Sequence, residues 1–230
     1  IRCGFYHCAP VPVVRHKGKY WRAMENMGQE WGWGPFSALM TSISCEADLL
    51  DAGQWNFSNE IRYDSSWKEG ATAWLEGNAV VTREGEVKDI LRVAYGPDDV
   101  AAMTSVSEDG KIMTFNPEKD FIKLPGAGKK FTIRYDKKSK KDWTLSNFIL
   151  EKDRHNMDGG AIRNTQVLMC SDNLTEWCIK DTVLTCDQPE LYGFQYVDWQ
   201  FDGKDIVFVS RTAWRDKTGN PPRQHDANYM

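Results

Sequence analysis

The chain alternates short apolar and polar runs with a period of two, which is the pattern of half-buried β-strands. These runs lie on both sides of four tight turns, three of which contain a glycine (Gly18, Gly85 and Gly203) and the fourth of which lies near Ser139. Each turn therefore joins two strands into a hairpin. No long stretch has the 3.6-residue period of an amphipathic helix. The pattern predicts an all-β fold.

A second series of turns alternates with these hairpins. Three segments contain Ser, Asp or Gly turn residues and end in an aromatic residue, and their aromatic residues, Trp55, Phe115 and Trp177, lie roughly 60 residues apart. Ser and Asp side chains bond backbone amides in such turns, and glycine permits a positive φ. Each repeat thus contains two hairpins, or four strands. Four-stranded antiparallel units at a constant period are typical of the blades of a β-propeller.

The repeat predicts a single β-propeller domain segment over residues 1–230. Its four blades span approximately 5–64, 76–125, 130–185 and 194–230, and the last blade is incomplete. About 3.5 blades cannot close a ring, so we expect the chain to be a segment of a longer protein.

Composition excludes several classes of function. The chain has 230 residues, of which 41% are hydrophobic and 27% charged, and its formal net charge is −4. This balance gives no basic surface for nucleic acid, and no apolar run approaches the roughly 18 residues needed to span a membrane. The six cysteines are expected to be free and mostly buried, although Cys170 and Cys178 flank a turn and can pair across it. Nothing indicates the oligomeric state.

The turns resemble degenerate copies of the Asp-box repeat of sialidases and related propeller glycosidases. The stretches "WLEGNAVV", "KFTIRYD" and "GFQYVDWQFDGKDIVFVSRTAW" are similar to a bacterial exo-sialidase group of the sialidase superfamily. The Ser-x-Asp-x-Gly-x-Thr-Trp box is intact nowhere. The resemblance implies a six-bladed propeller, or a five-bladed one as in neighbouring glycosidase clans, with the active site at the axial mouth.

Four polar residues lie at comparable positions just before the first strand of each predicted blade: His7, Glu76, Lys130 and Gln195. In a propeller the innermost strands line the central channel, so these residues are candidates for substrate contact. Glu76 is the strongest candidate for catalysis. Apolar neighbours raise the affinity of a carboxylate for its proton, which suits a general acid or base near neutral pH. The alternative is an ion pair of Glu76 with Arg92 or Lys130.

The resemblance to sialidases also implies an arginine triad, because a guanidinium group binds a substrate carboxylate through two parallel hydrogen bonds. Arg92, Arg163 and Arg211 are the candidates. Sialidases use a tyrosine nucleophile activated by a glutamate, which suggests Tyr196 with Glu76 as its base. If the arginines do not converge, a neutral or uronic sugar replaces sialic acid as the expected substrate.

A partner carboxylate for glycoside hydrolysis is expected from Asp226 or Asp198. Glu25 lies on the second strand of the first blade and is either a structural partner of an arginine or a second acid. The remaining candidates for substrate binding are Gln224 and His225, which precede Asp226, and Trp33, which lies in a Gly-rich loop and can stack on a sugar ring.

The sequence contains no Gly-rich phosphate loop, nucleophile elbow or HExxH motif, and its four histidines are far apart, so no cofactor or metal is expected. The leading hypothesis is an exo-acting glycoside hydrolase that cleaves a terminal sugar from a glycan. We expect it to be secreted, periplasmic or at the cell surface. The alternatives are a carbohydrate-binding propeller without catalysis and a propeller used for protein interaction.

Overall fold

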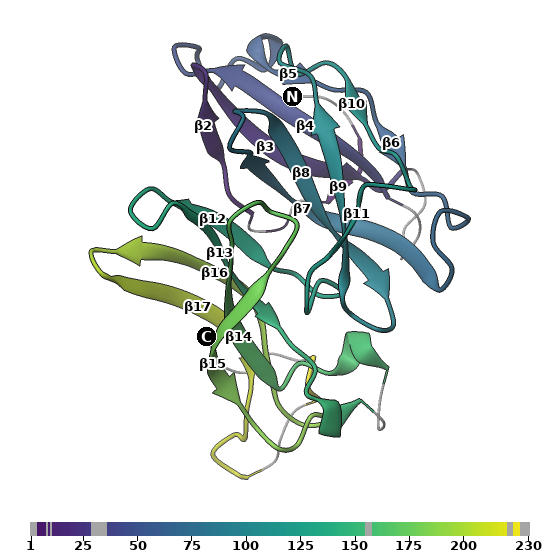
Figure 1. The fold of residues 1–230 in the computed structure, drawn as a ribbon, viewed down its shortest axis with the longest axis vertical. Helices are drawn as coiled ribbons and strands as arrows, with labels where there is room; N and C mark the ends of the chain where they lie inside the picture. Colours follow the sequence, from purple (N-terminus) through teal and green to yellow (C-terminus); the bar gives the residue numbers. More distant parts are fainter. Residues whose placement is uncertain are drawn as a thin grey trace. The chain divides into compact units, whose positions relative to one another are not determined.

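The computed structural model describes residues 4–7, 9, 11–28, 36–154, 158–219 and 223–225. Within them every regular element is a β-strand or a short 3-10 helix. The chain divides into two compact units, the first formed by residues 1–93 with 101–122 and the second by residues 94–100 with 123–230. Antiparallel sheets make up both units (Figure 1).

The first sheet of the first unit is built around the long hairpin of β3 and β4. Its strands are β1 (Tyr6–His7), β2 (Val14–His16), β3 (Lys19–Asn26), β4 (Ser37–Ser44), β5 (Asn56–Phe57) and β6 (Ile61–Arg62). Both β1 and β2 pair with β3, and both β5 and β6 pair with β4, so the sheet is four strands wide. The short helix η1 (Ala52–Gln54) lies in the turn before β5.

The second sheet of the first unit follows the order β10-β9-β8-β7, with β11 also paired to β9. Its strands are β7 (Ala71–Val81), β8 (Val87–Tyr95), β9 (Val100–Val106), β10 (Met113–Thr114) and β11 (Phe121–Lys123). Strand β7 begins at Ala71, ahead of the start at residue 76 that the sequence predicted for this blade. The alternation of apolar residues continues upstream of Glu76, and Ala71, Ala73 and Trp74 are all buried.

The second unit contains a four-stranded sheet and a two-stranded sheet. The strands of the first are β12 (Thr132–Asp136), β13 (Lys141–Asn147), β14 (Thr165–Ser171) and β15 (Cys178–Thr185), in that order. The helices η2 (Glu151–Asp153) and η3 (Gly159–Ala161) lie between β13 and β14. The second sheet pairs β16 (Gly193–Asp202) with β17 (Asp205–Ala213).

The structure confirms the prediction of four-stranded antiparallel blades. All four hairpin turns form where predicted: Gly18, Gly85 and Gly203 have φ angles of 72°, 79° and 60°, and the fourth turn ends at Lys140 with φ 56°. The turns of the turn-aromatic segments also form, between β4 and β5, between β9 and β10 and between β14 and β15. In the third of them, the indole N–H of Trp177 donates to the Leu174 carbonyl (3.0 Å).

In each unit, the first strand of the second sheet packs against the first sheet, as in neighbouring propeller blades. Strand β7 contacts β3 and β4 in the first unit, and β16 contacts β12, β13 and β14 in the second. Trp74 is fully buried and donates its indole N–H to the Phe36 carbonyl (2.9 Å). In the second unit, Trp199 on β16 donates to the Thr132 carbonyl (2.8 Å) and packs on Leu145.

Candidate active site

Five ionisable side chains gather in the first unit, on strands β1, β3, β7 and β8. These residues, here called the carboxylate cluster, are His7, Glu25, Glu76, Asp89 and Arg92. The three acidic residues are at most 2% exposed, Arg92 is 5% exposed, and the His7 side chain is 32% exposed. Charged side chains are rarely buried unless they are paired or functional. His7 is therefore the member of the cluster most open to a ligand.

Strand β7 runs through Glu76, whose backbone φ is positive at 56°. Strand β16 has the same feature at Tyr196 (φ 53°), beside a register shift between Gln195 and Asp198. A non-glycine residue with positive φ costs about 1–3 kcal/mol and is common at functional sites. A bulge also redirects a side chain that would otherwise follow the strand alternation. In both units, a residue that the sequence marked as a catalytic candidate thus has a positive φ inside a strand, and in β16 this residue lies in a bulge.

Glu76 forms an ion pair with Arg92 on the neighbouring strand (Oε2 to Nη1, 2.8 Å). This was one of the two pairings that the sequence left open. Lys130, in the second unit, instead donates to the Thr132 hydroxyl and the Val197 carbonyl. Glu76 lies inside β7 and not just before it, because the strand starts at Ala71. A role for Glu76 must therefore be compatible with an ion pair in the protein interior.

His7 and Glu25 lie directly opposite each other on β1 and β3. The Nδ1 atom of His7 is 3.2 Å from Glu25 Oε2, and Glu25 Oε1 accepts the backbone N–H of Gly77 (2.8 Å). A carboxylate only accepts hydrogen bonds, so Nδ1 carries the hydrogen and Nε2 is the nitrogen left for a ligand. The hydrogen bond to Glu25 raises the pKa of His7, although burial acts in the opposite direction. The pair forms a histidine–carboxylate dyad with a fixed ring orientation.

Asp89 is fully buried beside Gly77, and neither of its carboxyl oxygens has a hydrogen-bond partner in the described part of the chain. Burial raises its pKa well above the usual 3.8, and the negative charge of Glu25 adds to this effect. A methyl group on Gly77 would overlap the Asp89 carboxyl oxygens, so any larger residue at this position would have to displace the Asp89 side chain. Asp89 is thus a carboxylic acid that keeps its proton at pH values at which an exposed aspartate has lost its proton.

Replacing Asp89 by asparagine is expected to remove a pH dependence of stability. The folded protein keeps the Asp89 proton above pH 4, whereas the unfolded chain releases it, so the wild-type free energy of unfolding falls as pH rises. The slope from one such group is at most about 1.4 kcal/mol per pH unit. Urea unfolding of wild type and Asp89→Asn between pH 4 and pH 8 measures this slope. The free energy of unfolding of the variant is expected to rise relative to that of wild type toward pH 8. The exposed Asp202→Asn is the control, and equal slopes for Asp89→Asn and wild type would contradict the prediction.

Six predicted residues come together in the second unit: Arg163, Gln195, Tyr196, Arg211, Gln224 and His225, here called the arginine–tyrosine cluster. The Arg211 guanidinium lies 4.1 Å from the Tyr196 ring centroid, and the Arg163 guanidinium lies 5.9 Å from it. The Tyr196 and His225 rings are 6.4 Å apart and perpendicular. Cations over an aromatic face are attracted by the quadrupole of the ring. Two positive charges therefore flank one phenol.

Hydrogen bonds fix the geometry of this cluster. Gln195 is fully buried and donates to the backbone carbonyls of Gln224 (3.1 Å) and His225 (2.9 Å). Arg211 donates to the His225 carbonyl (3.2 Å). Of the three predicted arginines, Arg163 and Arg211 thus lie together, while Arg92 belongs to the first unit and is paired with Glu76.

The other predicted residues have different surroundings. Asp198 forms an ion pair with Arg134 (3.0 Å), and its side chain is 46% exposed. Asp226 and Trp33 lie outside the described residues, so their predicted roles stay predictions. The sequence indicated a close approach at Gly77, but it predicted neither the hydrogen bond of the Gly77 N–H to Glu25 nor a role for Asp89. The sequence feature that could have identified Asp89 is its position as the one acidic residue of β8, directly before an apolar run.

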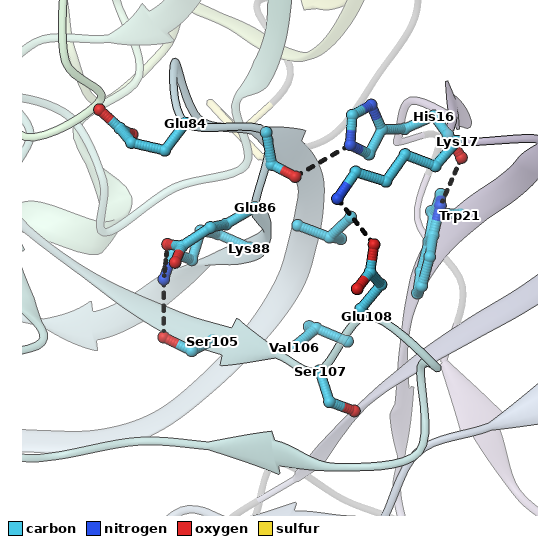
Figure 2. A pocket seen from close by; sticks show the side chains of 12 residues that line it. His16, Lys17, Trp21, Glu84, Glu86, Lys88, Ser105, Val106, Ser107 and Glu108 are labelled. Carbon is cyan, nitrogen blue, oxygen red and sulfur yellow. Dashed lines mark hydrogen bonds and ion pairs between the residues drawn. The ribbon is translucent and has the colours of Figure 1, made fainter.

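A pocket of about 420 Å³ lies in the first unit, between the β2–β3 and β7–β8 turns (Figure 2). Lys17 pairs with Glu108 there (2.8 Å), and the His16 ring lies 2.9 Å from the Gly85 carbonyl. Lys88 donates to the Ser105 hydroxyl (2.9 Å). A second pocket of about 450 Å³ is lined by Arg62, Tyr63, Asp64, Ser65, Trp67 and Thr72. No member of the carboxylate cluster lines either pocket.

Among the described residues, no three histidine, cysteine or acidic side chains are arranged to hold a metal ion. None of the helices in the described ranges has the length and hydrophobicity needed to cross a membrane.

Comparison with known proteins gives matches to structures only. No protein-family model and no curated protein sequence matches the chain. An exo-1,5-α-L-arabinanase from a bovine ruminal metagenomic library matches with a TM-score of 0.52 and 11% identity, over 93% of this chain and 76% of that chain. The GH32 β-fructofuranosidase of Bombyx mori, also solved as a mutant in complex with sucrose, matches with a TM-score of 0.58 and 15% identity, over 91% and 42% of the chains. An exo-inulinase from Aspergillus awamori gives a TM-score of 0.56 and 12% identity, over 92% and 46%.

The chain therefore has an all-β fold of antiparallel blades that matches part of a propeller glycosidase. The similarity is to five-bladed β-propeller glycoside hydrolases and not specifically to sialidases. The chain spans about three quarters of the arabinanase and less than half of the β-fructofuranosidase and the exo-inulinase. At these levels of identity, the likeness establishes the fold alone.

Proposed function

We propose that this chain belongs to an exported, exo-acting glycoside hydrolase that removes a terminal sugar from a glycan. The observation that carries the proposal is the His7–Glu25 dyad, fixed by the Gly77 N–H and surrounded by the buried Asp89 and the Glu76–Arg92 pair. Structures with this fold include an exo-arabinanase and an exo-inulinase, which supports an exo-acting hydrolase.

The dyad provides a proton donor. In the proposed reaction, the His7 imidazolium donates its Nε2 proton to the oxygen of the leaving group, and the Glu25 carboxylate holds the ring and its charge. The raised pKa of His7 keeps a fraction of this imidazole protonated near neutral pH. The transition state of glycoside hydrolysis resembles an oxocarbenium ion. In this proposal, the Glu25 and Glu76 carboxylates stabilise its positive charge electrostatically, whereas the protonated Asp89 contributes no charge.

The finer proposal is a sugar that carries a carboxylate, and a uronic sugar is favoured over sialic acid because Arg92 is paired with Glu76 and does not join the other two arginines. Its support is the arginine–tyrosine cluster, where Arg163 and Arg211 flank Tyr196. Guanidinium groups bind carboxylates through paired hydrogen bonds. Tyr196 is the proposed nucleophile of this version, as in sialidases.

A panel of 4-nitrophenyl glycosides tests the function. It contains an α-L-arabinofuranoside, a glucuronide and neutral hexosides, together with a 4-methylumbelliferyl sialoside and inulin. Release of a terminal sugar by the intact protein, lost in His7→Asn and retained in His16→Asn, is the expected result. His16 is a suitable control because it lies at the other end of the strands. A preference for the glucuronide or sialoside that Arg211→Gln abolishes would support the acidic sugar.

The second candidate is a carbohydrate-binding propeller without catalysis. It is favoured by the burial of Glu76 and Asp89, which are 1% and 0% exposed. Binding on a glycan array with no turnover of any substrate in the panel would establish this candidate and reject the hydrolase.

A further inference from the structure

Two cysteines of the second unit face each other across neighbouring strands. Cys170 on β14 and Cys178 on β15 are direct partners in the antiparallel register, and both are free thiols. Side chains of directly opposite residues point to the same face of a sheet, with Cβ atoms about 4.5–5.5 Å apart. A disulfide needs a Cβ separation of about 3.5–4.5 Å. A small local movement is therefore enough to join them.

The turn between the two cysteines is held by its own hydrogen bonds. The Ser171 hydroxyl accepts the backbone N–H groups of Asn173 (3.2 Å) and Leu174 (2.9 Å). The Asn173 side chain accepts those of Thr175 (3.0 Å) and Glu176 (2.9 Å). These bonds fix the register of β14 against β15 beside the turn. The thiols are thus placed opposite each other before any bond forms.

The two thiols differ in their access to solvent. Cys178 is exposed, whereas Cys170 is 3% exposed. Burial also raises the pKa of the Cys170 thiol. Reactivity of a thiol toward an external disulfide follows its thiolate fraction and its accessibility. Cys178 is therefore the residue that an external reagent reaches first.

We propose that Cys170 and Cys178 are a reversible dithiol–disulfide pair that is oxidised by glutathione disulfide. The Cys178 thiolate attacks glutathione disulfide, which forms a mixed disulfide and releases one glutathione. The Cys170 thiolate then attacks the Cys178 sulfur and releases the second glutathione. The protein loses two electrons and two thiol protons, and the two glutathione thiols gain them. The disulfide closes the turn at residues 171–177. This inference does not depend on the proposed hydrolase activity.

The test is peptide mapping of the intact protein after equilibration with glutathione disulfide, followed by acid quenching and maleimide blocking of the remaining thiols. The expected product is one peptide pair joined through Cys170 and Cys178, which disappears after dithiothreitol. The oxidised protein is expected to unfold at a temperature about 5 °C higher, because the cross-link constrains the unfolded chain. Cys45→Ser is expected to leave the cross-link unchanged, and Cys178→Ser to abolish it.

Two results would overturn the proposal. One is accumulation of a glutathione adduct on Cys178 while the Cys170 thiol stays reactive with maleimide. The other is a cross-link that joins Cys170 or Cys178 to a different cysteine. Neither readout requires a variant that removes the buried Cys170, so a folding defect cannot obscure the outcome.

Discussion

Replacing Glu25 by glutamine is expected to lower kcat/KM on the best substrate by roughly 10²- to 10⁴-fold without unfolding the protein. The Glu25 carboxylate accepts two hydrogen bonds, one from His7 and one from the Gly77 N–H. An amide has only one acceptor oxygen, so one of these two donors loses its partner. The measurement is kcat and KM separately, from pH 5 to pH 8, with thermal unfolding as a check of the fold.

The pH profile distinguishes positioning of His7 from a purely structural role of Glu25. Glu25 raises the pKa of His7, so its removal shifts the kinetic limb due to His7 toward lower pH. The exposed Glu46→Gln is the control, with wild-type kinetics expected. A Glu25→Gln enzyme with kcat within threefold of wild type and an unshifted profile would exclude the dyad from the mechanism.

Replacing Glu76 by alanine is expected to destabilise the protein by about 3–5 kcal/mol. The ion pair of Glu76 with Arg92 lies in the interior, and loss of one partner of a buried ion pair is strongly destabilising. The change in the free energy of unfolding is measured by urea denaturation at pH 7. The loss is expected to appear at constant m-value, because the folded and unfolded states keep their exposed surface.

A double variant separates the charge effect from simple loss of packing. When Glu76→Leu is combined with Arg92→Met, both charges are removed and the volume is retained, so much of the stability should return. The single variant Glu76→Gln keeps a hydrogen-bond acceptor and is expected to lie between wild type and Glu76→Ala. A double variant as unstable as Glu76→Ala alone would contradict the ion-pair explanation.

The fold could be predicted from the sequence because its signals are local. The period-two alternation, the glycines that permit positive φ and the Ser and Asp side chains that bond turn amides all act within a few residues. They placed the β2–β3, β7–β8 and β16–β17 turns correctly. The first strand of the second blade begins earlier than predicted, because the buried apolar residues continue upstream of the acidic Glu76. The strand continues through Glu76, which has a positive φ.

The candidate site could be predicted only in part. Sequence position identified His7, Glu25 and Glu76 as separate candidates, but not that His7 and Glu25 form a dyad. That contact depends on the register of β1 against β3, which is set by packing and not by either segment alone. Asp89 was missed, because burial of a carboxyl group is a property of the assembled sheets.

The sequence by itself thus determined the strand pattern, the turn chemistry and the class of residues available for catalysis in this protein. These features depend on backbone preferences and short-range hydrogen bonds. Only the tertiary structure decided that Glu76 pairs with Arg92, that Glu25 binds both His7 and the Gly77 N–H, and that Asp89 is buried. The reason is physical: ion pairing, desolvation and side-chain direction at a bulge depend on which strands lie side by side.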